Sequence, residues 1–140
     1  MLSDYILALL KVAKEENAEV TAIKFQKIFF LLEKEKGVNL GIEFEPYLFG
    51  PYSEKLQNIL YELAKQGFVK INYEPVNNLA GVTVGYKESY EIAKEVEVSV
   101  SDDVLEFFRE WAKKSRNKIQ EYVYKKYPEY SDIKTHRKGT

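Results

Sequence analysis

Residues 44–67 have the sequence FEPYLFGPYSEKLQNILYELAKQG, in which an aromatic turn runs into a capped helix. Gly50 and Pro51 predict the turn, because glycine tolerates unusual backbone angles and proline fixes φ. Ser53 is placed to cap a helix that ends at Gly67. Apolar residues recur along this helix at helical spacing and predict one buried face, made by Leu56, Ile59, Leu60, Leu63 and Ala64.

The aromatic side chains around this turn admit three interpretations. They could line a ligand pocket, belong to a strained catalytic turn, or pack a short strand against a neighbouring helix. Because Gly50, Pro51 and Ser53 each have a local structural role, we interpret the stretch as a structural corner. Tyr52 has no such role, so its ring is the first candidate here for contact with a partner.

Two helices are predicted upstream of this stretch. Ser3 can cap the first, which runs through Glu16, and Thr21 can cap the second, over residues 22–36. The second helix stops at Gly37, a residue suited to the left-handed position after a helix end. Its middle is apolar nearly all round, which predicts a central helix that is covered on most sides.

The predicted β-structure consists of short alternating runs. Residues 42–49 form an extended segment, which Pro46 places at a sheet edge because proline cannot donate to a ladder. Residues 68–73 and 86–93 alternate at period two and predict a hairpin, with a loop rich in Pro, Asn and Gly between them. Residues 95–100 either continue this hairpin or act as a linker, and the pattern leaves both readings open.

Two more helices are predicted at the carboxy-terminal end. Ser101 is followed by two acidic residues, which favour the positive end of a helix dipole. Ser115 can cap a last helix through about Tyr127, and Pro128 stops it. These helices either cover the open face of the core or pair with a second copy, which would make a homodimer through the C-terminal helices.

The order helix, helix, short strand, helix, hairpin predicts the fold class. It is typical of an α+β winged helix-turn-helix with a β-hairpin wing, here with a two-helix C-terminal extension. We expect one such domain over residues 1–133 and a frayed polar tail over 134–140. The helix over 53–66 is then the candidate reader of a DNA groove.

Two quoted stretches carry a resemblance to known families. KFQKIFFLLEKEKG and FEPYLFGPYSEKLQNILYELAKQGFV resemble YwgA-type proteins and, more distantly, the SocA-type or Panacea antitoxin-like domains. The SocA-type turn usually continues Gly-Pro-Val, whereas this chain has Tyr52 after Pro51, which favours the YwgA side. The resemblance implies a winged-helix regulator, antitoxin or proteolytic adaptor. The matching positions are Lys24, Phe25, Gln26, Lys27, Tyr47, Gly50, Pro51, Tyr52, Leu56, Leu60, Leu63 and Gly67.

The composition argues against most kinds of catalysis. The chain of 140 residues has no cysteine, and its single histidine, His136, lies in the polar tail. Thiol chemistry, histidine zinc sites and a Ser/His triad are therefore disfavoured, and no phosphate-binding glycine motif is present. We predict no enzyme activity and no cofactor. With no export signal and no apolar run long enough for a bilayer, we expect a cytoplasmic protein without membrane contact. Abundant Lys and Glu suggest a thermophile.

Charge is distributed unevenly along the chain. Residues 1–103 carry a balance of −6 and residues 104–140 a balance of +5, so the carboxy-terminal third is the face suited to a polyanion. The leading expectation is a transcriptional regulator that binds double-stranded DNA through the third helix, the wing and this basic segment. The candidate DNA-binding residues are Tyr52, Lys55, Gln57, Asn58, Lys65, Lys70, Lys87, Arg109, Lys113, Lys114 and Arg116.

A protein-interaction module of the antitoxin or adaptor type is the alternative. The third helix is weakly charged, because Glu54 and Glu62 offset its lysines. Such a helix suits a protein surface better than a DNA groove. An aromatic series in the last two helices could build a dimer surface, although Phe108 and Trp111 are better interpreted as core.

Overall fold

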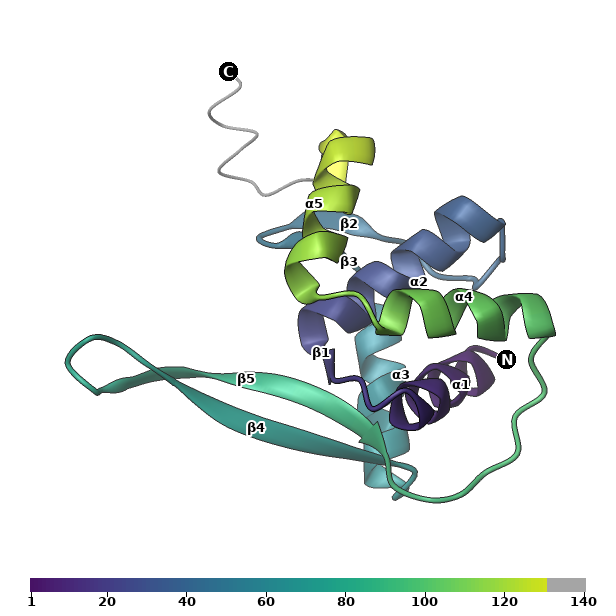
Figure 1. The fold of residues 1–140 in the computed structure, drawn as a ribbon, viewed down its shortest axis with the longest axis horizontal. Helices are drawn as coiled ribbons and strands as arrows, with labels where there is room; N and C mark the ends of the chain where they lie inside the picture. The colour runs from purple at the N-terminus through teal and green to yellow at the C-terminus, as the bar shows by residue number, and fades with distance from the viewer. Residues whose placement is uncertain (131–140) are drawn as a thin grey trace.

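The computed structural model describes residues 1–130, which form five α-helices and two small antiparallel sheets of an α+β fold (Figure 1). The predicted tail over 134–140, with His136, lies outside the described residues. The elements are α1 (Leu2–Glu15), β1 (Val20–Thr21), α2 (Ala22–Lys36), β2 (Glu45–Tyr47), β3 (Gly50–Tyr52), α3 (Glu54–Lys65), β4 (Val69–Asn77), β5 (Thr83–Ile92), α4 (Asp102–Ala112), α5 (Arg116–Lys126) and the 3₁₀ helix η1 (Pro128–Tyr130).

Four of the five predicted helix caps are confirmed. The hydroxyl oxygens of Thr21, Ser53, Ser101 and Ser115 each accept a hydrogen bond from the backbone N–H three residues later, at 3.1 to 3.3 Å. The cap predicted at Ser3 is wrong. Helix α1 already begins at Leu2, and the terminal ammonium of Met1 reaches the carboxylate of Asp4 at 2.8 Å.

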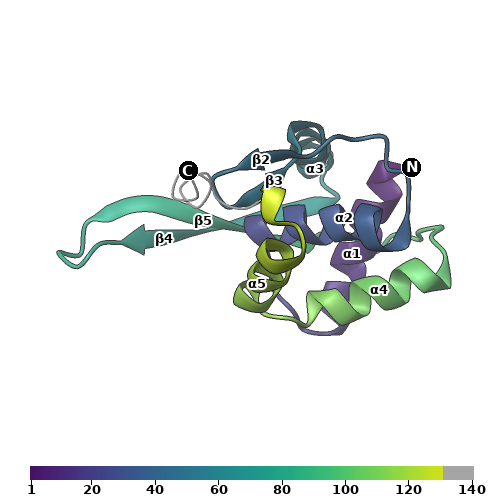
Figure 2. The same ribbon diagram turned by 90° about the horizontal axis from the view of Figure 1, so that it is seen from above.

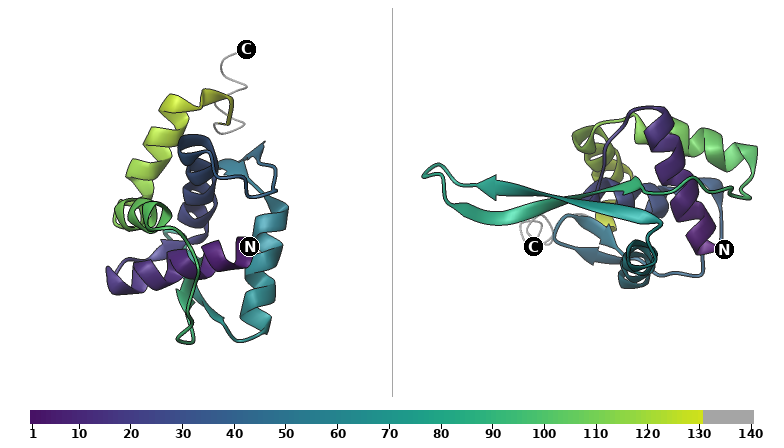
Figure 3. Two further views of the ribbon diagram at one scale, coloured as in Figure 1. Left: turned by 90° about the vertical axis from the view of Figure 1, so that its right-hand side faces the viewer. Right: turned by 90° about the horizontal axis from the view of Figure 1, so that it is seen from below.

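Helix α2 is the centre of the core, as its apolar middle predicts. Phe25, Ile28, Phe29, Phe30, Leu31 and Leu32 have no exposed surface. Helices α4 and α5 pack against α2 on one side and α3 lies on the other side, while α1 packs against both α4 and α3 (Figures 2 and 3). Full burial of these side chains supplies the main driving force for folding, at roughly 1.5 to 3 kcal/mol for each large apolar residue.

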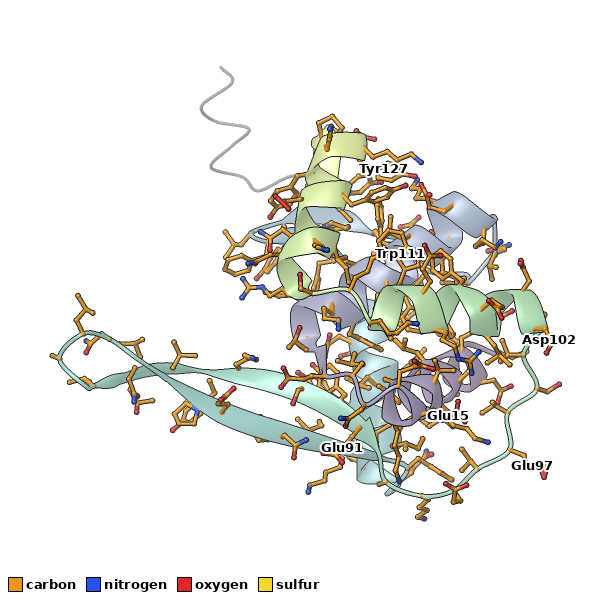
Figure 4. All side chains as sticks on the ribbon, viewed as in Figure 1. Glu15, Glu91, Glu97, Asp102, Trp111 and Tyr127 are labelled. Carbon is orange, nitrogen blue, oxygen red and sulfur yellow. The ribbon has the colours of Figure 1, made fainter. Side chains whose placement is uncertain are left out.

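The two C-terminal helices cover the core, which was one of the two roles expected for them. Phe108 contacts Phe29 with ring centroids 5.6 Å apart, and Trp111 contacts Tyr122 at 5.0 Å. Figure 4 shows Trp111 on α4 and Tyr127 at the end of α5, both in the angle between these helices and α2. Phe108 and Trp111 are therefore core residues, as predicted.

The larger sheet contains a hairpin, β4–β5, which we call the long hairpin. Its strand order is β1-β5-β4, and β1 pairs with the base of β5 through Val20 opposite Tyr90. The predicted hairpin is confirmed, but its strands are longer than expected because the ladder continues through Pro75, opposite Tyr86. Residues 95–100 belong to no strand and link the sheet to α4.

The second sheet is a short hairpin of β2 and β3. The extended segment around Pro46 is confirmed, but the turn predicted at Gly50 and Pro51 is wrong. These two residues lie in β3, with Pro51 paired opposite Pro46, and the chain reverses at residues 48–49 instead. The two hairpins extend in the same direction from the helices (Figures 1 and 2).

Candidate functional site

Three polar side chains near the start of α2 are buried in the core. The exposed fractions of Lys24, Gln26 and Lys27 are 6%, 5% and 1%. All three belong to the stretch KFQK over residues 24–27, for which the sequence analysis predicted no structural role. Burying such groups is unfavourable unless each finds hydrogen-bond partners, so their partners show what the motif does.

Lys24 joins α2 to the end of α4. Its ammonium donates to the backbone oxygen of Glu19 at 2.7 Å and to that of Ala112 at 2.8 Å. Ala112 is the last residue of α4, where carbonyl groups lack partners within the helix and carry partial negative charge. Burial lowers the pKa of Lys24, and the nearby carboxylate of Glu19 opposes this shift. Lys24 therefore has a structural role in docking α4.

Gln26 holds the start of α3. Its side-chain oxygen accepts from the backbone N–H of Ser53 at 2.8 Å, and its amide nitrogen donates to the backbone oxygen of the same residue at 3.1 Å. The amide nitrogen also lies 3.0 Å from the side-chain oxygen of Gln57. Gln57 in turn donates to the hydroxyl of Tyr90 at 2.8 Å, and Tyr90 donates to Glu88. This buried network links α2, α3 and β5.

Lys27 lies beneath the short hairpin. Its ammonium donates to the backbone oxygen of Phe49, at the reversal of the chain, and lies 5.9 Å from the ring centroid of Tyr124 on α5. Burial, reinforced by the positive charge of Arg116, lowers the pKa of Lys27 to about 7. At neutral pH the ammonium and the neutral amine are therefore both populated, because burial makes the charge costly, and either form can donate to the hairpin.

Gly50 explains why the hairpin can approach Lys27 so closely. Its φ of 115° is in a region that residues with a side chain rarely adopt. A Cβ at this position would also lie 3.1 Å from Cε and 3.2 Å from Nζ of Lys27. Glycine at position 50 and a buried lysine at position 27 therefore form one structural unit.

Three large apolar side chains of the short hairpin face solvent. Tyr47, Leu48 and Phe49 are 52%, 48% and 51% exposed, and the ring of Tyr47 lies 5.1 Å from that of Tyr52. The prediction that the aromatic residues pack the short strand against the central helix is wrong for the exposed Tyr47 and Phe49. Phe44 does pack against Phe30, at 5.4 Å.

A small apolar pocket of about 160 Å³ lies between the short hairpin and the start of α2. We call this pocket, together with the exposed side chains of Tyr47, Leu48 and Phe49, the hairpin surface. Tyr52, which the sequence singled out for partner contact, is one of the lining residues and is half-buried. The pocket is lined by Ala22, Ile23, Gln26, Lys27, Tyr47, Phe49, Gly50, Pro51, Tyr52 and Gln57.

The DNA-contacting residues predicted on α3 divide into two groups. Lys55, Asn58 and Lys65 are exposed, as a groove-reading helix requires. Gln57 is only 6% exposed, and both ends of its side-chain amide bond to Gln26 and Tyr90. The prediction that Gln57 faces DNA is therefore wrong, because its hydrogen bonds are used inside the core.

The basic residues predicted on the long hairpin differ from each other. Lys70 is exposed near the base of β4. Lys87 lies 3.5 Å from Glu19 and 3.6 Å from Glu74, so two carboxylates already offset its charge. Lys87 is accordingly a weaker phosphate contact than its charge alone suggests.

The basic cluster of α4 and α5 lies on the far side of the molecule from α3 (Figures 2 and 3). Arg109 pairs with Glu15 at 3.2 Å and with Glu16 at 3.1 Å. Lys113 also lies 3.8 Å from Glu16, and Lys114 lies 4.0 Å from Glu110. Arg116 is exposed at the start of α5. These residues and α3 cannot contact the same stretch of a straight duplex.

Comparison with known proteins adds no family to this description. Neither a family model nor a curated protein matches the chain. Within residues 1–130, no group of three or more His, Asp or Glu side chains could hold a metal ion, and no helix is long and apolar enough to cross a membrane.

Proposed function

We propose that the chain is a winged-helix interaction module that binds a protein partner through its hairpin surface. The observation that carries this proposal is the exposure of Tyr47, Leu48 and Phe49 beside an apolar pocket. Aromatic side chains are enriched at the centres of protein interfaces, where they contribute most of the binding energy.

The position of β1 supports the winged-helix part of the proposal. Strand β1 lies between α1 and α2 and pairs with β5, so the long hairpin completes a three-stranded sheet beside three helices. In a winged helix, a short strand between the first two helices pairs with the wing in this way. By this comparison, α3 takes the place of the recognition helix and β4–β5 that of the wing.

The hairpin surface is fixed in place, which favours binding. Lys27 holds the chain reversal at Phe49, and Gln26 holds the backbone at Ser53, directly after β3. A surface that is ordered before binding loses less conformational entropy when the partner docks. The buried polar motif therefore supports the aromatic side chains from beneath.

DNA binding is the second candidate function. It is favoured by the exposed Lys55, Asn58 and Lys65 on α3, with Lys70 nearby on β4. It is disfavoured by Glu54 and Glu62 on the same helix and by the position of the α4 and α5 cluster. Binding through phosphate contacts would weaken steeply as salt rises.

A variant of the protein that carries a photo-crosslinking amino acid in place of Phe49, expressed in the native host, tests the proposal. We expect one protein to be trapped covalently there. The same residue at Leu79, fully exposed at the tip of the long hairpin, is the matched control and should trap none. Absence of a specific adduct at position 49 would overturn the hairpin surface as the binding site.

Retention on duplex DNA at low salt tests the second candidate. For the interaction module we expect no retention. Retention that is lost on combining Lys55→Ala with Asn58→Ala would favour a DNA-binding regulator instead, with α3 as its reader.

A further inference from the structure

The outer edge of β4 carries no strand within the described part of the chain. In the order β1-β5-β4, this strand pairs with β5 on one side only, and no other strand of residues 1–130 pairs with its second edge (Figure 1). An edge of this kind presents unpaired backbone N–H and C=O groups to any chain that can pair with them. Edge strands therefore either carry protection against pairing or serve as interfaces.

The features that protect β4 from pairing occur only in its outer half, which lies toward the tip of the long hairpin. Pro75 removes one backbone donor, and a register shift between Val76 and Asn77 bends the strand. Residues 69–74 have neither proline nor irregularity, and their ladder with β5 is regular. This inner half of the edge is open to pairing.

The side chains of the inner half are complementary to themselves. In an antiparallel pair with a two-fold axis at Asn72, Lys70 of one copy lies opposite Glu74 of the other, and both such pairs form at once. Ile71 then lies opposite Tyr73, a combination of β-branched and aromatic side chains that stabilises sheets. Tyr73 is 62% exposed, and Lys70 and Glu74 are exposed.

Other registers lack this complementarity. An axis at Ile71 sets Lys70 opposite Asn72, and an axis at Tyr73 sets Glu74 opposite Asn72, so neither forms the Lys70–Glu74 pairs. An axis at Lys70 or at Glu74 sets two like charges opposite each other. Like charges in directly opposite positions are destabilising. We therefore propose that two copies of this chain associate through antiparallel pairing of their β4 strands about Asn72, which joins their sheets into one six-stranded sheet. This interface is separate from the hairpin surface and does not depend on it.

Cysteine crosslinking tests the position of the axis, since the native chain contains no cysteine. The two residues at the axis lie directly opposite, with Cα atoms about 4.5 to 5.5 Å apart, which suits a disulfide. We expect Asn72→Cys to form a covalent dimer under mild oxidation. Val76→Cys, exposed on the same strand but away from the axis, is the matched control and should crosslink at least about tenfold more slowly, because its two copies are about 26 Å apart.

Charge exchange tests the register by sedimentation of the uncrosslinked protein. Lys70→Glu and Glu74→Lys should each weaken dimerisation by about tenfold or more, since each replaces two attractive pairs with two repulsive ones. The double variant Lys70→Glu/Glu74→Lys should restore the native affinity. Glu74 also contacts Lys87 within the chain, so the stability of each variant is compared by urea denaturation.

Three results would overturn the proposal. They are a native protein that remains monomeric at the highest concentration reached, equal crosslinking of the two cysteine variants, and a double variant as weak as the single ones. The crosslinking result stands by itself, because Asn72→Cys keeps the native charges at positions 70 and 74.

Discussion

Replacement of the buried Lys27 by methionine should change how stability depends on pH. Lys27 is 1% exposed, and its pKa falls from 10.5, the ordinary value, to about 7 in the folded chain. Between these two pH values the unfolded chain holds the proton while the folded chain has released it. The unfolded state then binds more protons, so the free energy of unfolding of the native protein rises as pH rises.

The size of the effect follows from the same two pKa values. Each unit of difference corresponds to about 1.4 kcal/mol, and for these values the gain from pH 7 to pH 9 is about 2 kcal/mol. Below about pH 6 both states hold the proton, so the contribution of Lys27 no longer varies. The variant Lys27→Met lacks this titration, while all other groups titrate in both proteins.

Urea denaturation of the two proteins at pH 7, 8 and 9 measures the difference directly. From pH 7 to pH 9, we expect the free energy of unfolding to rise by about 2 kcal/mol more in the native protein than in Lys27→Met. Lys34→Met, at an exposed position of the same helix, controls for the loss of one lysine. If the free energies of unfolding of the native protein and of Lys27→Met change with pH in parallel, the lowered pKa of Lys27 is refuted.

Three further substitutions probe the support of the hairpin surface and the surface charges. Gly50→Ala should lower the free energy of unfolding by about 1 to 3 kcal/mol, because position 50 has a positive φ and a Cβ there would press on Lys27. Gly85→Ala is the control and should be near neutral, because a Cβ at position 85 would have no atom within 4 Å. Gln26→Leu should cost about 3 kcal/mol, since it leaves the backbone N–H of Ser53 and the side-chain oxygen of Gln57 without their buried partner; a loss below about 1 kcal/mol by urea denaturation would contradict this role. Arg109→Ala should cost less than about 1 kcal/mol in thermal or urea unfolding, because its ion pairs are at the surface.

Local features of the fold were predictable from the sequence. The caps at Thr21, Ser53, Ser101 and Ser115 depend on contacts within four residues, which a local pattern records. The apolar middle of α2 likewise predicted a central helix, because a helix that is apolar all round has to be covered. Both kinds of inference use neighbours along the chain.

Contacts between distant residues were not predictable in the same way. Nothing near Lys27 in the sequence indicates that it bonds Phe49 or that Gly50 makes room for it. Gln57 is polar and follows Leu56, so a simple periodicity places it at the surface, yet Gln26 and Tyr90 satisfy its amide in the core.

Residues from the two ends of the described chain meet in the core, and this has a consequence for folding. Helix α1 packs against α4, and β1 pairs with the base of β5. During synthesis the first helix leaves the ribosome long before either of these partners exists. Helix α1 also contacts α3 and β5, but the part of its apolar face that packs on α4 stays uncovered until α4 emerges. A nascent chain that is cut short before residue 102 is therefore expected to be captured by chaperones or proteases.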